Sequence, residues 1–182
     1  MKEDPIYFID TETTGLSSKR HEITEICILK RQPGEVDRQW TWRVNPEHLY
    51  TASVYALNLN GFDFELWAET GLSQAEAAKE CAEILQAPGI IVAHNAQFDL
   101  KFLRSMMHQQ NQPFSFPDSV VCTRSLSDQL KIITGWKSSS MDSIRGYLGW
   151  STEGAHTASK DVDDLAKLYD YLIGLISDRA NL

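Results

Sequence analysis

The sequence lacks a long apolar run, which excludes a membrane-spanning helix of ordinary length. Crossing a bilayer takes about 20 consecutive apolar residues, whereas this 182-residue chain has only short apolar segments separated by polar ones. The N-terminus, Met1 to Pro5, is charged and leads directly into a short apolar segment, unlike a secretory signal peptide. We therefore expect no membrane partner and a cytoplasmic protein.

Cysteine is scarce, and repeats, low-complexity tracts and Gly/Ser-rich linkers are absent. Cys27, Cys81 and Cys122 are far apart and odd in number, so they match neither a disulfide framework nor a zinc-binding spacing. We expect them to be ordinary core or half-buried side chains. Because the length suffices for one full-sized core, residues 1–182 are expected to form a single domain.

Positive charge is also limited. The chain has 17 Lys and Arg against 25 Asp and Glu, and its net charge is -8. This balance argues against a strong non-specific grip on duplex nucleic acid, which needs dense Lys and Arg. It does not exclude a nuclease, because a carboxylate site becomes positive once divalent cations bind. A phosphate-gripping Walker loop and a nucleophile elbow are both missing.

The apolar pattern predicts strands first and then strands that alternate with helices. Ile6–Ile9 is typical of a buried strand, and residues 23–29 and 36–44 are expected to form an antiparallel pair around a Pro-Gly turn. Ser73, followed three residues later by glutamate, predicts a capped helix. This order indicates an α/β fold with a mixed sheet flanked by helices. The remaining expected strands are 90–93 and 119–123, and the expected helices are 73–85, 97–109, 124–133, 141–148 and about 157–176.

Two carboxylates follow the first buried strand. Asp10 and Glu12 are two residues apart, so on a strand they point to the same face. We expect them at the carboxyl end of a central strand, where open α/β sheets place ligands. Solvated acids in a loop are the alternative.

Asp99 and Asp161 are both predicted on core-facing helical stripes. Asp99 lies within about 60° of Phe102, Leu103 and Met106 on a helical wheel. Asp161 lies within about 40° of Leu165, Leu168 and Leu172. A buried carboxylate needs a cation, a proton or several donors, since burial without them is costly. For Asp99, a bond to an arginine or to a helix end remains the alternative.

The acids that neighbour Asp161 differ from it on the same wheel. Asp163 points to the opposite side and is expected to be solvated, whereas Asp164 lies about 60° from the apolar line and is less easily dismissed. His156 is about 140° away from Asp161 if both are helical, so it is expected in the loop or first turn before the helix. Thr157 is a candidate N-cap, and an ordinary surface histidine is the alternative reading of His156.

Together, three separated segments deliver four carboxylates and a histidine. Oxygen ligands suit hard cations such as Mg²⁺ or Mn²⁺. Four acids are enough to hold two such ions about 4 Å apart, the arrangement used for in-line attack on phosphate. In that arrangement one ion activates the attacking water, a neutral histidine accepts its proton, and the other ion stabilises the leaving 3′-oxygen.

Three motifs in this order resemble those of the DEDDh 3′→5′ exonucleases, the DnaQ-like superfamily that includes the proofreading subunit of bacterial replicative polymerases. The motifs are Asp10-Thr-Glu-Thr-Thr-Gly-Leu16, His94-Asn-x-x-Phe-Asp99 and His156-x-Ala-x-x-Asp161, and the resemblance spans residues 6 to about 175. It implies a ribonuclease H-like fold. Thr157 stands where the tyrosine class has its Tyr, so the histidine class is favoured.

The resemblance also implies roles. Asp10, Glu12, Asp99 and Asp161 are implied to bind the metal ions, and His156 is implied to be the general base. The terminal nucleotide is implied to contact the stretch from Thr13 to Leu16, partly through backbone amides. Further residues are expected to bind the substrate or support the site, although Phe98 is equally compatible with plain core and the Asn58–Phe62 segment with a plain turn. The full set expected near the substrate is Thr11, Thr13, Thr14, Gly15, Leu16, Asn60, His94, Asn95 and Phe98.

The expected function is metal-dependent 3′→5′ hydrolysis of nucleic acid, with single-stranded DNA favoured and release of nucleoside 5′-monophosphates. Exposed aromatics stack bases in such sites, and Trp40, Trp42, Trp67 and Trp136 are candidates whose default assignment is core. RNA trimming and a non-catalytic interaction module are the alternatives, because no residue here reveals a contact to a 2′-hydroxyl. The chain ends soon after its last helix, so we expect a free-standing enzyme, with a polymerase or homodimer partner left open.

Overall fold

The computed structural model describes residues 4–180 and builds them around a five-stranded mixed sheet. The strand order is β3-β2-β1-β4-β5, where β1 pairs antiparallel with β2 and parallel with β4. β3 pairs antiparallel with β2, and β5 parallel with β4. The predicted mixed α/β fold is confirmed. The bounds are β1 Ile6–Thr13, β2 Ile23–Arg31, β3 Arg38–Arg43, β4 Ile90–Ala93 and β5 Ser119–Cys122.

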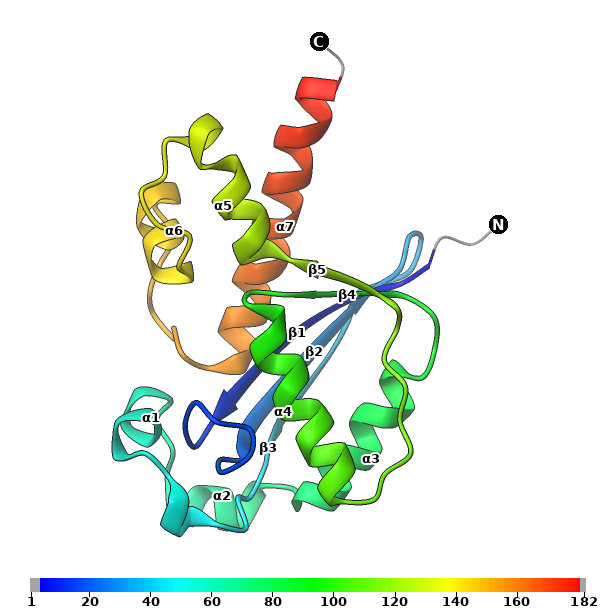
Figure 1. Cartoon of the computed structure of the whole chain (residues 1–182), viewed down its shortest axis with the longest axis vertical. Coiled ribbons are helices and arrows are strands. Elements are labelled where there is room, and N and C mark those ends of the chain that lie inside the picture. The colour runs from blue at the N-terminus through cyan, green and yellow to red at the C-terminus, as the bar shows by residue number, and fades with distance from the viewer. Residues whose placement is uncertain (1–3, 181–182) are drawn as a thin grey trace.

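Helices cover both faces of the sheet (Figure 1). α3 (Gln74–Leu85) and α4 (Ala96–Gln109) lie on one face, and α7 (Ala158–Ala180) lies on the other. α5 (Thr123–Thr134) and α6 (Met141–Leu148) pack against α7. The predicted capping box of α3 is present, with Ser73 accepting from the Glu76 N–H. Within residues 4–180, none of the helices is both long and apolar enough to span a bilayer.

Side-chain alternation on β1 divides the core into two layers. Tyr7 and Ile9 pack toward α3 and α4, whereas Phe8 packs toward α7. Since residues two apart on a strand share a face, Asp10 and Glu12 continue the face of Phe8. Beyond the apolar layer, this face therefore carries its carboxylates toward the beginning of α7.

Two strand boundaries differ from the prediction. β1 continues to Thr13, because β2 keeps pairing past the apolar segment, with Glu12 opposite Glu25. Asp10 and Glu12 thus lie within the strand and not after its end. β3 begins at Arg38, and Val36 is 89% exposed in the preceding turn. The apolar Val36 lies in the turn, so the sequence pattern placed the beginning of this strand too early.

Two short helices were missed by the sequence pattern. α1 (Val54–Leu59) and α2 (Phe64–Thr70) lie beside the tip of β1 (Figure 1). They are tied to an irregularity in the β1–β2 pairing, where Asn60 Nδ2 donates to Thr24 Oγ1 at 3.3 Å and Trp67 Nε1 donates to the Thr24 carbonyl at 2.7 Å. Helices of one or two turns depend on such tertiary contacts more than on periodicity.

The three cysteines are free, as predicted. Cys27 and Cys81 are buried, and Cys122 is half-buried at the end of β5. Burial raises the pKa of both the Cys27 and the Cys81 thiol to about 12. These two side chains are therefore neutral small core residues at physiological pH.

Candidate functional site

The predicted pair on β1 is joined by a third acid from β2. Glu12 lies opposite Glu25 in the antiparallel register, so the two side chains occupy one face of the sheet. Glu25 Oε2 accepts a hydrogen bond of 2.7 Å from the Ala158 N–H, the first residue of α7. Glu25 therefore satisfies a free N–H at the start of α7 and anchors that end of the helix beside β1.

Asp99, on the first turn of α4, is held against the middle of β1. It is 2% exposed, and its Oδ1 accepts from both the Thr11 N–H at 3.1 Å and the Thr11 hydroxyl at 2.9 Å. The prediction that Asp99 faces the core is confirmed. Two donors on one oxygen leave Oδ2 as the oxygen available to a further partner.

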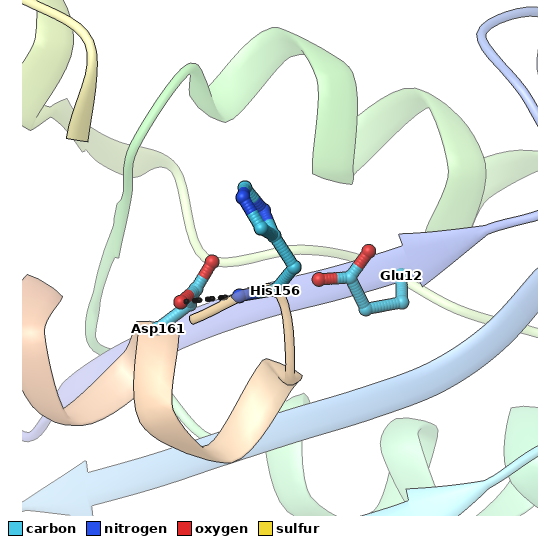
Figure 2. A group of neighbouring side chains, drawn as sticks. All are labelled: Glu12, His156 and Asp161. Carbon is cyan, nitrogen blue, oxygen red and sulfur yellow. Dashed lines mark hydrogen bonds between the residues drawn. The ribbon is translucent and has the colours of Figure 1, made fainter. Parts of the chain in front are cut away.

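Asp161 and His156 stand at the beginning of α7 next to Glu12 (Figure 2). One candidate ligand atom from each of Glu12, His156 and Asp161 lies within 4.8 Å of the others. As predicted, His156 precedes the helix, and Thr157 Oγ1 accepts from the Lys160 N–H at 3.4 Å in the manner of an N-cap.

The His156 backbone has an unusual conformation. Its φ is +65°, in the left-handed region that non-glycine residues rarely adopt. The Asp161 carboxylate compensates, because its Oδ1 accepts from the His156 N–H at 3.3 Å (Figure 2). Residues with such strained backbones cluster at functional sites. Here the hydrogen bond from the His156 N–H holds His156 beside Asp161.

The carboxylates raise one another's pKa. Burial raises the pKa of Asp10 well above its usual value, and the charges of Asp99, Asp161 and Glu12 raise it further. Burial and the same kind of repulsion raise the pKa of Glu12 to about 8, and burial raises that of Asp99 to about 7. The mutual repulsion places these four acids, drawn from β1, α4 and α7, in one electrostatic cluster.

This cluster fits a divalent cation. Its donors are carboxylate oxygens, which suit Mg²⁺ or Mn²⁺. Burial and the neighbouring acids both raise the pKa of Asp10 and Glu12, so their ionised forms are disfavoured without a cation. A bound cation supplies the missing positive charge and lets the acids ionise together. The residues able to hold it are Asp10, Glu12, Asp99 and Asp161.

Without divalent cations, the protein should lose stability as the pH rises from about 4 to about 8. The Glu12 and Asp99 pKa values of about 8 and about 7 exceed the unfolded values, so the folded state binds more protons across this range. Thermal unfolding in chelator at several pH values measures this trend, and added Mn²⁺ should abolish it. A melting temperature that rises with pH in chelator would contradict the raised pKa values.

A cavity of about 400 Å³ adjoins the acids. The loop after β1 forms one wall, where Thr13 Oγ1 donates to the Gly15 carbonyl at 2.8 Å and Thr14 N–H donates to the Glu22 carbonyl at 2.8 Å. A Cβ on Gly15 would lie 2.7 Å from the His21 ring, so the close approach requires glycine. The lining residues are Thr11, Glu12, Thr13, Gly15, Leu16, His21, Ser53, Tyr55, Ala56, Leu59 and Phe98.

Some of the residues predicted to contact substrate line this cavity, and the others lie outside its lining. Thr11, Thr13, Gly15, Leu16 and Phe98 line the cavity, and Leu16 is 86% exposed there. Thr14 is fully buried, with its hydroxyl accepting from the Glu22 N–H. Phe98 also packs on Phe102 at 4.8 Å between ring centroids, so it belongs to the core as well as to the cavity lining.

Three other predicted residues lie outside that cavity's lining. Asn60 is buried, and its Nδ2 donates to the Thr13 carbonyl at 3.2 Å, so it supports the loop wall. His94 Nδ1 lies 3.0 Å from Thr123 Oγ1, and burial lowers its pKa to about 4. Asn95, with φ of +77°, begins α4 in the left-handed region that asparagine tolerates. Their geometry is that of supports for the strand, loop and helix that carry the acids.

The four candidate tryptophans have the core positions that were their default assignment. Trp67 and Trp136 are buried, and Trp40 and Trp42 pack against the α3–α4 core. None of these four tryptophans lines the cavity beside the acids. The aromatic side chains that do line it are Tyr55 and Phe98. Tyr55 comes from the unpredicted helix α1, which explains why the sequence pattern overlooked it.

Arg145 and Glu25 were missed as well. The Arg145 side chain is fully buried and donates to Asp161 Oδ1 at 2.6 Å and to Asp164 Oδ2 at 2.8 Å. Asp163 is exposed, as predicted, whereas Asp164 is buried and paired. A signal existed, because Arg145 falls at helical spacing from the apolar Met141 and Leu148, and Glu25 alternates with Cys27 on the core face of β2.

The exonuclease family profile, RNase T, matches residues 7–169. The chain belongs to this exonuclease family. It has the ribonuclease H-like fold of the DnaQ-like exonucleases, as the three motifs predict.

Curated relatives agree with this membership. The chain is 25% identical over 173 residues to a PolC-type DNA polymerase III of Clostridium perfringens, covering 93% of this chain and 11% of that protein. It is 24% identical over 169 residues to the DNA polymerase III epsilon subunit of Aquifex aeolicus, covering 88% and 76%. The chain thus spans about a tenth of the length of the PolC-type relatives it matches.

The fold is shared with solved exonucleases. Escherichia coli exonuclease I in complex with a dT13 oligonucleotide superposes with a TM-score of 0.80 at 14% identity, over 94% of this chain and 41% of that one. At this identity the likeness concerns the fold. It confirms the predicted ribonuclease H-like architecture.

Proposed function

We propose that this chain hydrolyses single-stranded DNA from its 3′ end and releases nucleoside 5′-monophosphates. The observation that carries the proposal is the convergence of Asp10, Glu12, Asp99 and Asp161 with His156 beside an apolar cavity. The cavity is large enough for one nucleotide unit at the scale of small-ligand sites. Support for DNA comes from exonuclease I, a structural neighbour solved with a dT13 oligonucleotide.

In this proposal, Asp10, Glu12, Asp99 and Asp161 hold two divalent cations, Mg²⁺ or Mn²⁺. When bound, such cations lower the pKa of an attacking water and stabilise the leaving 3′-oxygen. His156, whose N–H donates to Asp161 Oδ1, accepts the proton of that water. The four acids would hold the cations, which would supply positive charge to the reacting phosphate.

The cavity residues position the terminal nucleotide. Tyr55 and Phe98 offer aromatic faces to a base, since every base has a face that stacks regardless of sequence. Leu16 is exposed at the mouth, where an apolar side chain can pack against a base. In this proposal the loop from Thr13 to Gly15 forms the cavity wall beside the sugar and phosphate. Asn60, His94 and Asn95 act through the elements that they support.

A digestion experiment tests the proposal. Oligonucleotides of single-stranded DNA, double-stranded DNA and RNA of equal length, labelled at the 5′ end, are incubated with the protein and Mn²⁺. We expect a ladder that shortens from the 3′ end, fastest for single-stranded DNA. Preferred cleavage of RNA would instead establish RNA trimming, and cleavage of no substrate would favour a non-catalytic module. A proofreading or repair role, a polymerase partner and a cytoplasmic location remain predictions.

The His156→Ala variant should lose turnover and keep metal binding. General-base catalysis contributes about 10²–10⁴-fold, so kcat should fall within that range while the four carboxylates still bind Mn²⁺. Single-turnover kinetics measure the first effect and calorimetric Mn²⁺ titration the second. His108→Ala, at an exposed histidine in the last turn of α4, is the comparison. Loss of Mn²⁺ binding in His156→Ala would move the histidine among the metal ligands.

A further inference from the structure

Arg145 is a buried cation that contacts three carboxylates at once. From α6, its Nη2 donates to Asp161 Oδ1 at 2.6 Å, its Nη1 to Asp142 Oδ1 at 2.9 Å and its Nε to Asp164 Oδ2 at 2.8 Å. The side chain is 0% exposed. A planar guanidinium presents donors in several fixed directions, so one side chain can orient three acids simultaneously.

The contact to Asp161 leaves one oxygen available. Oδ1 accepts from Arg145 and from the His156 N–H at 3.3 Å, so Oδ2 is the oxygen left for a cation. The same arrangement holds Asp99, whose Oδ1 accepts twice from Thr11. Two acids from different helices are thus each held through one oxygen by two donors.

The contact to Asp142 reaches the histidine. Asp142 Oδ1 accepts from Arg145, and its Oδ2 lies 3.7 Å from His156 Nε2. Arg145 therefore stands between Asp161 and the acid that faces the His156 ring. The third contact of Arg145 differs, because Asp164 is fully buried and is also paired with Lys160 Nζ at 2.5 Å, on its own helix.

We propose that Arg145 is a positioning residue that fixes Asp161 directly and His156 through Asp142. This inference rests on the proposed function, in which Asp161 holds a cation and His156 takes a proton. Arg145 touches neither substrate nor the reacting atoms in this arrangement. Its Asp164 contact joins α6 to α7 and contributes packing, whereas its other two contacts determine the geometry of the site.

Arg145→Lys tests the positioning role, with Asp164→Asn as the matched control. Lysine keeps the charge but lacks the planar fork that spans three acids. We expect kcat to fall about 10²-fold, as for a misplacement near 1 Å, with KM for the oligonucleotide unchanged. Calorimetric Mn²⁺ affinity should fall about tenfold, as for other residues behind metal ligands. Asp164→Asn should lower the melting temperature and keep kcat and Mn²⁺ affinity.

Wild-type kcat and Mn²⁺ affinity in Arg145→Lys would overturn the proposal. Equal losses in Asp164→Asn would also overturn it, because Arg145 would then act only through helix packing. If the wild-type chain cleaves no nucleic acid, the proposed function fails, and the Mn²⁺ affinities still decide the role of Arg145.

Asp142→Asn tests the second contact separately and does not depend on how well Arg145→Lys folds. Asp142 has a 59% exposed side chain, so its amide variant should fold normally. We expect kcat to fall about tenfold, as when the carboxylate that orients a functional histidine is lost, with Mn²⁺ affinity unchanged. An unchanged kcat would overturn the link from Arg145 to His156.

Discussion

The Asp10→Asn variant should lose activity by at least about 10³-fold and melt at a higher temperature than the wild type in chelator. Activity should fall because an amide is a poor ligand for a hard cation, and electrostatic terms of this kind contribute about 4 kcal/mol to catalysis. Stability should rise because the ionised Asp10 is disfavoured by burial and by the charges of Asp99 and Asp161. A gain in stability with a loss of activity distinguishes a functional acid from a structural one.

Rate assays with Mn²⁺ and thermal unfolding in chelator measure the two effects. Asp163→Asn is the control, since Asp163 is an exposed acid on the same helix as Asp161, and it should leave both quantities unchanged. Full activity in Asp10→Asn would remove Asp10 from the metal site. A lower melting temperature would show that the carboxylate stabilises the fold through bonds to protein donors.

Chelation of divalent cations should stop digestion entirely. Arg145 contacts Asp161 and compensates part of the negative charge of the four acids. Asp10 and Glu12 still have strongly raised pKa values. Ionised acids alone would repel a phosphate, so cations are needed to bring the two together. We expect EDTA to reduce the rate to the uncatalysed background, and Mg²⁺ or Mn²⁺ to restore it.

Ca²⁺ is the informative control for this experiment. It takes more oxygen ligands at longer distances than Mg²⁺ and in looser geometry, so it should bind and raise the melting temperature without restoring the full rate. The oligonucleotide ladder and the melting curve are recorded on the same samples. Hydrolysis that continues at an unchanged rate in excess EDTA would exclude the metal-dependent mechanism.

Helical periodicity correctly predicted from the sequence that two of the four acids, Asp99 and Asp161, face inward. Asp99 is 2% exposed and Asp161 is half-buried, whereas Asp163 is exposed. Strand alternation likewise placed Asp10 and Glu12 on one face. These predictions succeeded because the direction of a side chain on a regular element depends on its spacing from near neighbours in the chain.

Contacts between distant segments were not predictable in the same way. The bond from Thr11 to Asp99 joins residues 88 positions apart, and Arg145 reaches Asp161 and Asp164 over 16 and 19 positions. The aromatic lining of the cavity was overlooked for the same reason, since only the placement of α1 brings Tyr55 to it. Spacing along the chain contains no information on which helix packs beside which strand.

The sequence by itself therefore determined the fold class and the family, and it predicted which four acids and which histidine form the candidate site. These follow from local periodicity and from motifs that are each contiguous in the chain. Only the tertiary structure decided that Glu25 anchors the start of α7 and that Asp161 shares its Oδ1 between Arg145 and the His156 N–H. The physical reason is that hydrogen bonds and ion pairs act over a few ångströms in space, whatever the separation of their partners along the chain.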